Sequence, residues 1–263
     1  MTPHPLLDAD EVPAVEPYLR SVGEVFRTFR EQDSGNVSYG VQLHGGDRWF
    51  VKEAVTDRAQ ESLDRAWAFH RAVRHPAIVP QLHRIAVRTG GRTAAVMPWR
   101  QGELLYGPAV RARFRALPVP RILRALDRIL DAHLAVESAG RVAVDLYDGA
   151  FLYDFDADAL HLIDLDEYRP GPFVLTTDRL PGSRRFMAPE EWHRGAVIDT
   201  RTTVYVLCRA ARLLLDAGNE ERAWRGTAAQ LAVVERGTRA DPGERFAGVR
   251  ELTEEWRAAT SGR

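Results

Sequence analysis

Three acidic residues beside one predicted hairpin carry the chemistry that this sequence suggests. Asp145 precedes the first strand of the hairpin, and Asp164 and Asp166 follow its second strand. A hairpin brings its two ends together, so we expect the three carboxylates to cluster. Clustered hard oxygen ligands suit Mg²⁺, which takes one or two carboxylates together with phosphate oxygens. Asp is common at turns and strand ends, where it caps exposed backbone groups. A single Asp here is therefore weak evidence for a metal site, and the cluster of three is stronger evidence.

The chain also holds one lysine in a composition that otherwise uses arginine for its positive charges. Lys and Arg together number 36, and Lys52 is the single lysine among them. It lies in the apolar stretch 48–54, which is predicted to be a β-strand. An ammonium is a compact point charge on a flexible stem, whereas a guanidinium is a planar fork. A compact ammonium suits contact with phosphate oxygens, and a surface lysine left by chance is the alternative that this position alone leaves open.

Two regions of different character have to position these residues. The first is β-rich, with predicted strands within 24–54, a helix at 59–73 and strands at 85–87 and 93–97. The second is mainly helical around the hairpin, with predicted helices at 111–117, 121–140, 202–216, 223–235 and 249–259. We therefore expect an α+β protein of two lobes, residues 1–98 and 99–263, with a small antiparallel β lobe carrying one helix and a larger helical lobe.

The composition excludes several classes of function. A net charge of −1 provides no basic field for nucleic acid, and no apolar run is long enough to span a membrane. The single cysteine, Cys208, cannot form an intrachain disulfide, which fits a reducing compartment. Residues 1–12 show neither the basic start nor the apolar core of a signal peptide. These features predict a cytoplasmic protein whose partners are neither nucleic acids nor membranes.

Several short motifs, taken in order, resemble those of the protein-kinase superfamily over nearly the whole chain. Residues 35–41 are similar to a thinned glycine-rich loop, and 50–52 to the strand whose lysine binds the α- and β-phosphates. Residues 74–79 match the family's His-Pro-x-Ile-Val turn, and 96–102 resemble the hinge that contacts adenine through backbone groups. The resemblance implies a nucleotide site that includes Gly35, Gly40, Lys52, Met97 and Trp99.

The most specific match is the segment 182–190, Gly-Ser-Arg-Arg-Phe-Met-Ala-Pro-Glu, which is similar to the end of a protein-kinase activation segment. Together with the family's Asp-Pro-x-x-Arg pattern near the C-terminus, it implies an ion pair between Glu190 and Arg245 that holds the fold. The resemblance places Asp145 where the catalytic Asp orients the acceptor hydroxyl and takes its proton. It places Asp164 where the Mg²⁺-binding Asp begins the activation segment.

Some residues that support catalysis in the family are replaced. The helix glutamate that pairs with the lysine falls on Ala66, so the resemblance leaves the partner of Lys52 open. The catalytic loop has Ala143 and Val144 in place of the usual His and Arg. Without that Arg, a phosphorylated activation loop lacks its usual anchor, which argues against control by loop phosphorylation.

Further replacements affect the metal site and the helix that follows the activation segment. Ala150 stands at the family's metal-binding Asn, so Asp148 or Asp166 would supply the missing oxygen. Thr203 falls where the family has a buried anchoring Asp. Asp199, a turn earlier, is predicted to be a helix N-cap.

The sequence thus predicts an ATP- and Mg²⁺-dependent phosphotransferase of the Ser/Thr protein-kinase-like class, with a hydroxyl on a protein as acceptor. Asp145 and Lys52 would be catalytic, Ser183 would lie near Asp145, and the metal ligands would come from Asp164, Asp166 and Asp148. Two alternatives stay open. One is a small-molecule phosphotransferase, because the Ile-Asp-x-Asp pattern also resembles aminoglycoside and choline kinases. The other is a non-catalytic pseudokinase that acts by binding partners.

Overall fold

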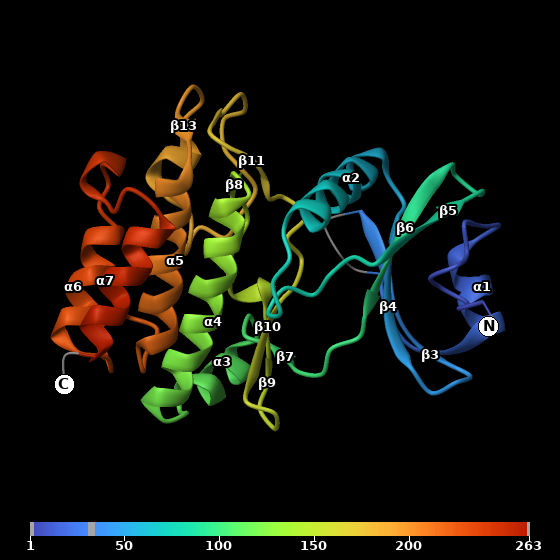
Figure 1. Cartoon of the computed structure of the whole chain (residues 1–263), viewed down its shortest axis with the longest axis horizontal. Coiled ribbons are helices and arrows are strands. Elements are labelled where there is room, and N and C mark those ends of the chain that lie inside the picture. The colour runs from blue at the N-terminus through green and yellow to red at the C-terminus, as the bar shows by residue number, and fades with distance from the viewer. Residues whose placement is uncertain (1–2, 31–34, 262–263) are drawn as a thin grey trace. The chain divides into compact units, whose positions relative to one another are not determined.

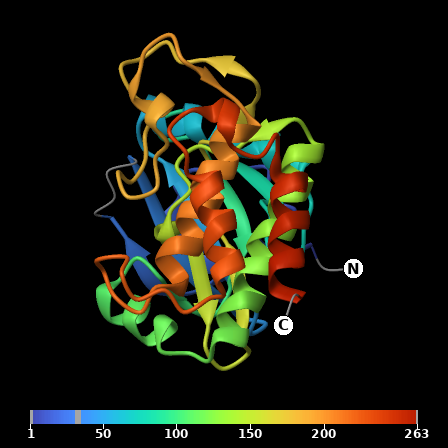
Figure 2. The same ribbon diagram turned by 90° about the vertical axis from the view of Figure 1, so that its left-hand side faces the viewer.

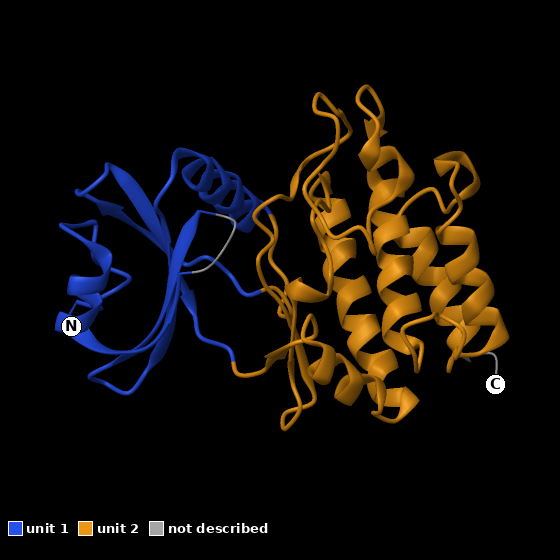
Figure 3. Ribbon diagram, turned by 180° about the vertical axis from the view of Figure 1, so that it is seen from behind, with its two compact units in different colours: residues 1–72, 79–100 blue, residues 73–78, 101–263 orange. Residues whose placement is uncertain are grey.

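The computed structural model describes residues 3–30 and 35–261. In this part of the chain it has seven α-helices and a mixed six-stranded sheet, which confirms the predicted α+β class (Figure 1). The chain divides into two compact units (Figure 3). The first is residues 1–72 with 79–100, and the second is residues 73–78 with 101–263. The main division therefore falls after Arg100, where the sequence suggests Pro98.

The first unit is built on the six-stranded sheet, whose strand order is β1-β5-β6-β4-β3-β2 and in which only the β1–β5 pair is parallel. Its strands are β1 (Glu11–Val12), β2 (Gly23–Phe29), β3 (Asn36–Leu43), β4 (Arg48–Ala54), β5 (His83–Val87) and β6 (Arg92–Pro98). Its helices are α1 (Val15–Val22) and α2 (Asp57–Ala72). The spacing of apolar residues in the sequence predicts α2 but not α1, because α1 is short and buries just Val15 and Leu19.

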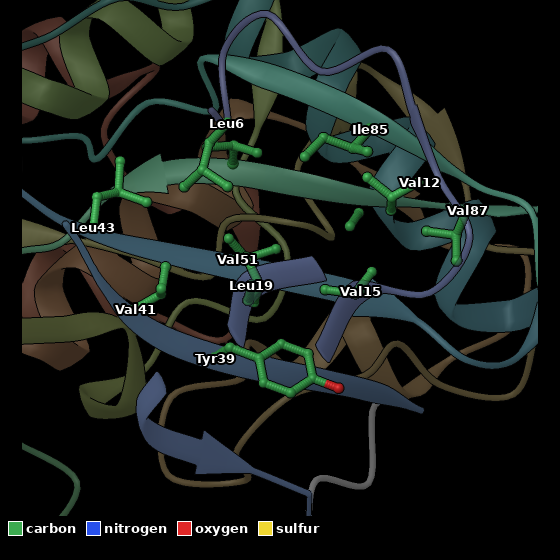
Figure 4. Packing of buried hydrophobic residues seen from close by; sticks show 12 residues of the cluster. Leu6, Val12, Val15, Leu19, Tyr39, Val41, Leu43, Val51, Ile85 and Val87 are labelled. Atoms are coloured by element: carbon green, nitrogen blue, oxygen red, sulfur yellow. The ribbon is translucent and has the colours of Figure 1, made fainter. Parts of the chain in front are cut away.

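The two faces of this sheet have different roles. One face forms the core with the N-terminal segment and α1 (Figure 4). This core consists of Leu6, Val12, Val15, Leu19, Tyr39, Val41, Leu43, Val51, Ile85, Val87, Ala94 and Val96. Because side chains alternate along a strand, Ser38, Gly40 and Lys52 project from the opposite face. α2 covers part of that face through a small cluster of Ala54, Ala59, Leu63 and Ala95.

The second unit is mainly helical. Its helices are α3 (Pro108–Arg115), α4 (Val119–Ser138), α5 (Thr200–Leu215), α6 (Ala228–Gly237) and α7 (Val249–Ser261). Helices α5, α6 and α7 pack side by side, and α4 packs against α5 and α7 (Figure 2). Helix α6 begins later than the predicted 223, because the hydroxyl of Thr227 accepts a hydrogen bond from Gln230 N and caps the helix there.

Short strands complete the second unit. β7 (Glu103–Leu104), β9 (Phe151–Asp154) and β10 (Ala159–Leu162) form a three-stranded sheet in the order β10-β9-β7. Two further pairs are β8 (Arg141–Val142) with β11 (Arg169–Pro170), and β12 (Phe173–Val174) with β13 (Val197–Ile198). Three short 3₁₀ helices are η1 (Asp148–Ala150), η2 (Pro189–Trp192) and η3 (Pro242–Glu244).

The predicted hairpin is the β9–β10 pair, and its open end is closed by a hydrogen bond of 3.0 Å from Ile163 N to Ala150 O. The His-Pro turn joins the second unit at the same place. Ile78 forms a parallel bridge with Leu162, and Leu162 N donates to Ala77 O at 2.7 Å. No helix among the described residues is long and apolar enough to cross a membrane.

Candidate functional site

Asp145 and Asp164 share a left-handed backbone conformation, with φ angles of 61° and 57°. Such angles are uncommon outside glycine, although Asp tolerates them better than most residues, and they gather at functional sites. Asp145 comes just before η1, which leads into β9, and Asp164 comes just after β10. The two ends of the hairpin therefore present two carboxylates from the same kind of turn.

Tyr147 is half-buried two residues after Asp145. Burial, together with the negative charges of Asp145, Asp164 and Asp148, raises the pKa of Tyr147 to about 12. Tyr147 also contacts the ring of Tyr106 edge-on, with 5.9 Å between the ring centres. The clustering of Asp145, Asp164 and Asp166 that the hairpin predicts stays a prediction.

Asp148 is engaged by arginines. Its side chain is 1% exposed, and both of its oxygens accept from Arg185 Nη2 at 2.8 Å. Arg111 Nη1 donates to Asp148 Oδ2 at 3.0 Å. Two guanidinium groups on one carboxylate repel a divalent cation, so Asp148 does not fit the metal ligand that the sequence suggests. It anchors the segment that carries Arg185.

That segment, residues 182–190, lies beside Asp145. A Cβ atom added to Gly182 would lie 3.8 Å from Asp145 Oδ1. Within the segment, Ser183 O accepts from Phe186 N at 2.9 Å, and Arg209 Nε donates to Arg185 O at 2.9 Å. The segment is therefore ordered by its own turns and by contacts to α5 and Asp148.

The predicted pair between Glu190 and Arg245 is confirmed. The two side chains meet through two parallel hydrogen bonds of 2.7 and 2.8 Å, and the Arg245 side chain is 0% exposed. Thr202 Oγ1 donates to Glu190 at 2.8 Å. Arg245 also donates to the backbone carbonyls of Arg201, Arg239 and Ala240. Because every charged group is satisfied, removing one partner from such a pair costs about 3–5 kcal/mol.

Thr203 joins α5 to the backbone before Asp145. Its hydroxyl accepts a hydrogen bond of 3.0 Å from Ala143 N, and this contact is buried. Ala143 lies two residues before Asp145, so α5 holds the backbone that leads into the candidate catalytic turn. Asp199 caps α5 by accepting from Arg201 N at 2.8 Å, as predicted.

Glu191 is a further buried acid, which the sequence does not single out. Its side chain accepts from Ala188 N at 2.6 Å, and the residue is 1% exposed. Burial raises the pKa of Glu191 to about 8, and the Ala188 hydrogen bond only partly offsets this effect. Its carboxyl is therefore protonated at neutral pH, and the charges of Glu190 and Asp145 act in the same direction. The one feature of the sequence that indicates this buried acid is the pair of consecutive glutamates after Pro189.

In the first unit, Lys52 lies on β4 among buried polar groups. Lys52 is 8% exposed and pairs across the sheet with Ser38 and Ala95. Ser38 is fully buried and Asn36 is 2% exposed. Within residues 3–30 and 35–261, the Ser38 hydroxyl and the Asn36 amide have no hydrogen-bond partner. Asn36 and Ser38 therefore form a buried polar environment on the face of the sheet that carries Lys52.

Residues 35–41 do not form the predicted loop. Asn36–Leu43 is strand β3, and residues 31–34 lie outside the described residues. A Cβ atom on Gly40 would come within 2.7 Å of the Phe26 ring and 2.9 Å of Trp99. Gly40 thus makes room for aromatic packing. Gly35, which has a φ of 70°, makes room for Thr56, because a Cβ atom added to Gly35 would lie 2.4 Å from Thr56 Oγ1.

Aromatic rings cover the sheet beside Lys52. The rings of Phe26 and Trp99 meet edge-on at 4.9 Å, and Trp99 lies 6.2 Å from Phe50, which pairs with Met97 across the sheet. The backbone N–H of Trp99 already donates to Arg48 O at 3.2 Å. A base bound at this half-buried face would therefore contact Trp99 through its ring, in place of the backbone contact that the hinge resemblance implies.

Asp164 and Asp166 are the remaining candidates for Mg²⁺. Asp164 is exposed and Asp166 is 7% exposed. No group of three or more His, Cys, Asp or Glu side chains converges as a metal site in the described part of the chain. Mg²⁺ takes one or two carboxylates and completes its shell with nucleotide phosphates, so these two acids are of the right chemical type.

The chain matches no protein-family model, and no curated protein sequence matches it.

Proposed function

We propose that this protein is an ATP- and Mg²⁺-dependent phosphotransferase of the Ser/Thr protein-kinase-like class, with a two-lobed kinase-like fold. The observation that carries the proposal is the pair of left-handed carboxylates, Asp145 and Asp164, at the two ends of one hairpin. Segment 182–190 beside Asp145 supports it, because the Glu190–Arg245 pair holds the end of that segment.

Each of these residues has its own role in phosphoryl transfer. Lys52 binds phosphate oxygens, and Asp164 with Asp166 would hold Mg²⁺, which neutralises charge on the phosphates when bound. Asp145 orients the acceptor hydroxyl and takes its proton. The hydroxyl oxygen forms a bond to the γ-phosphorus as the bond from that phosphorus to the β-phosphate oxygen breaks, and ADP leaves. Positioning and charge neutralisation supply most of the rate in such reactions.

The second candidate is a binding module without catalysis. The aromatic packing of Phe26, Phe50 and Trp99 on the Lys52 side of the sheet favours it, because these rings fill part of the face that a base would use. The ordered segment 182–190 would then present a fixed surface to a partner. Nucleotide turnover separates the two candidates.

The test is production of ADP from ATP and Mg²⁺ by the wild-type protein and by Asp145→Asn. We expect turnover in the wild type, with water as the default acceptor, and a decrease of about 10²–10⁴-fold in Asp145→Asn. Asp156→Asn is the matched control, because Asp156 is exposed in the hairpin turn. Equal turnover in wild type and Asp145→Asn, with both folded by circular dichroism, would remove Asp145 from the reaction and overturn the proposal.

A further inference from the structure

An exposed cationic surface surrounds Trp192 in the second unit. The guanidinium carbons of Arg179 and Arg184 lie 5.5 and 5.6 Å from the centre of the Trp192 ring. Both arginines are exposed, whereas Trp192 is half-buried. We name these three residues the Trp192 patch. Cation–π contacts of this kind hold guanidinium groups in place while leaving their N–H donors available.

The acids of this region do not neutralise the patch. Within the described ranges, neither Arg179 nor Arg184 forms an ion pair with a carboxylate. Glu190 is engaged by buried Arg245, and the raised pKa of Glu191, about 8, keeps its carboxyl uncharged at neutral pH. Asp178 pairs with Arg194 at 3.1 Å. The patch is therefore a local positive surface on a chain whose net charge is −1.

The patch is tied to the candidate catalytic turn through one short stretch of chain. Arg184 is two residues from Gly182, whose added Cβ would lie 3.8 Å from Asp145 Oδ1. The next residue, Arg185, is held by Asp148 and turns its charge inward. Neighbouring arginines thus have different roles, because Arg185 fixes the segment and Arg184 faces solvent.

We propose that the Trp192 patch binds an anionic side chain of the protein acceptor, close in sequence to the hydroxyl that receives the phosphoryl group. This inference rests on the proposed function and names its substrate class. Guanidinium groups bind carboxylate and phosphoryl groups through paired hydrogen bonds, so glutamate, aspartate and phosphoserine share the required chemistry. The Trp192 ring offers an apolar surface to the CH₂ groups of that anionic side chain.

The experiment measures peptide binding without ATP, by fluorescence anisotropy. Three labelled peptides are compared: a serine flanked by glutamates, the same peptide with glutamine for glutamate, and a glutamine peptide with one phosphoserine. We expect the two anionic peptides to bind the wild type at least about tenfold more tightly than the neutral one. We also expect added salt to weaken the binding of the anionic peptides. Arg179→Glu/Arg184→Glu should lose this preference. Arg71→Glu/Arg250→Glu, which changes the same charge at exposed sites elsewhere, should keep it.

Equal binding of anionic and neutral peptides, or a preference that survives Arg179→Glu/Arg184→Glu, would overturn the inference. Equal loss in both double variants would also overturn it, because net charge and not the patch would then govern binding. A preference for only one of the two anionic peptides identifies the source of the negative charge. Since no nucleotide is present, failure of the ATP turnover test leaves this result readable, and anionic binding without turnover would describe a binding module.

Discussion

Arg185 donates from one nitrogen, Nη2, to both carboxylate oxygens of Asp148, with a distance of 2.8 Å to each. Asp148 is three residues after Asp145, and Arg185 is three residues after Gly182. One ion pair, in which Asp148 is buried and Arg185 is partly exposed, therefore joins the two pieces of chain that lie beside Asp145. It orders segment 182–190 through contacts within the chain itself.

The first prediction concerns this pair. Asp148→Asn should destabilise the protein by about 3–5 kcal/mol, because it leaves the guanidinium groups of Arg111 and Arg185 without their buried carboxylate. Arg185→Gln should cost less, since Arg111 still pairs with Asp148. Denaturant unfolding of both single variants and the double variant measures the coupling between them. Strictly additive free energies of unfolding would show that the pair does not hold the segment.

The same pair shows where sequence reasoning stops. Asp148 looks like a metal ligand in the sequence because it is an acid near a replaced Asn, and both of its arginine partners are 37 residues away along the chain. Nothing local identifies them. The Glu190–Arg245 pair is further apart, at 55 residues, and is nevertheless predicted, because two family-like motifs mark both of its ends.

Gly40 illustrates the same limit in the first unit. A glycine near a turn suggests a phosphate-binding loop, but the structure needs it for the contact between Phe26 and Trp99. That contact depends on which residues face each other across three strands, which spacing along the chain does not give. By contrast, the hairpin and helices α4, α5 and α7 follow from periodicity, because each buries a long and regular apolar stripe.

A second prediction concerns Thr203 and the turn that carries Asp145. Thr203→Val keeps the shape of the side chain but leaves the buried N–H of Ala143 without an acceptor, at a cost of about 1–3 kcal/mol. Thr203→Ser keeps the hydroxyl and serves as the control. Hydrogen exchange at the Ala143 amide should quicken in Thr203→Val and stay near the wild-type rate in Thr203→Ser. Unchanged protection in Thr203→Val would mean that α5 does not anchor the turn through this residue.

A third prediction follows from the raised pKa of Glu191. Its ordinary pKa is 4.5, and in the folded protein it is about 8, so between these values the folded state holds a proton that the unfolded chain has lost. The contribution of Glu191 to stability is therefore full below about pH 4.5 and is lost as the pH rises through 8. Glu191→Gln removes this titration while keeping a neutral hydrogen-bonding side chain.

The melting temperature of the wild type relative to Glu191→Gln should accordingly fall as the pH rises from about 5 to 9. Comparing the two proteins at each pH cancels other titrating groups, including buried His133, whose pKa burial lowers to about 4. A difference that stays constant across this range would place Glu191 in contact with water or with a positive partner.

The proposed function depends on the claim that the chain binds a metal–nucleotide complex, and thermal unfolding with ATP, with and without Mg²⁺, is the test of that claim. A ligand at 100 times its dissociation constant stabilises the folded state by about 2.7 kcal/mol. For a protein near this size, each kcal/mol raises the melting temperature by roughly 2–4 °C. We predict a rise that depends on Mg²⁺ in the wild type, disappears in Asp164→Ala and persists in Asp156→Asn. No rise at millimolar ATP in a folded wild-type protein would contradict the claim.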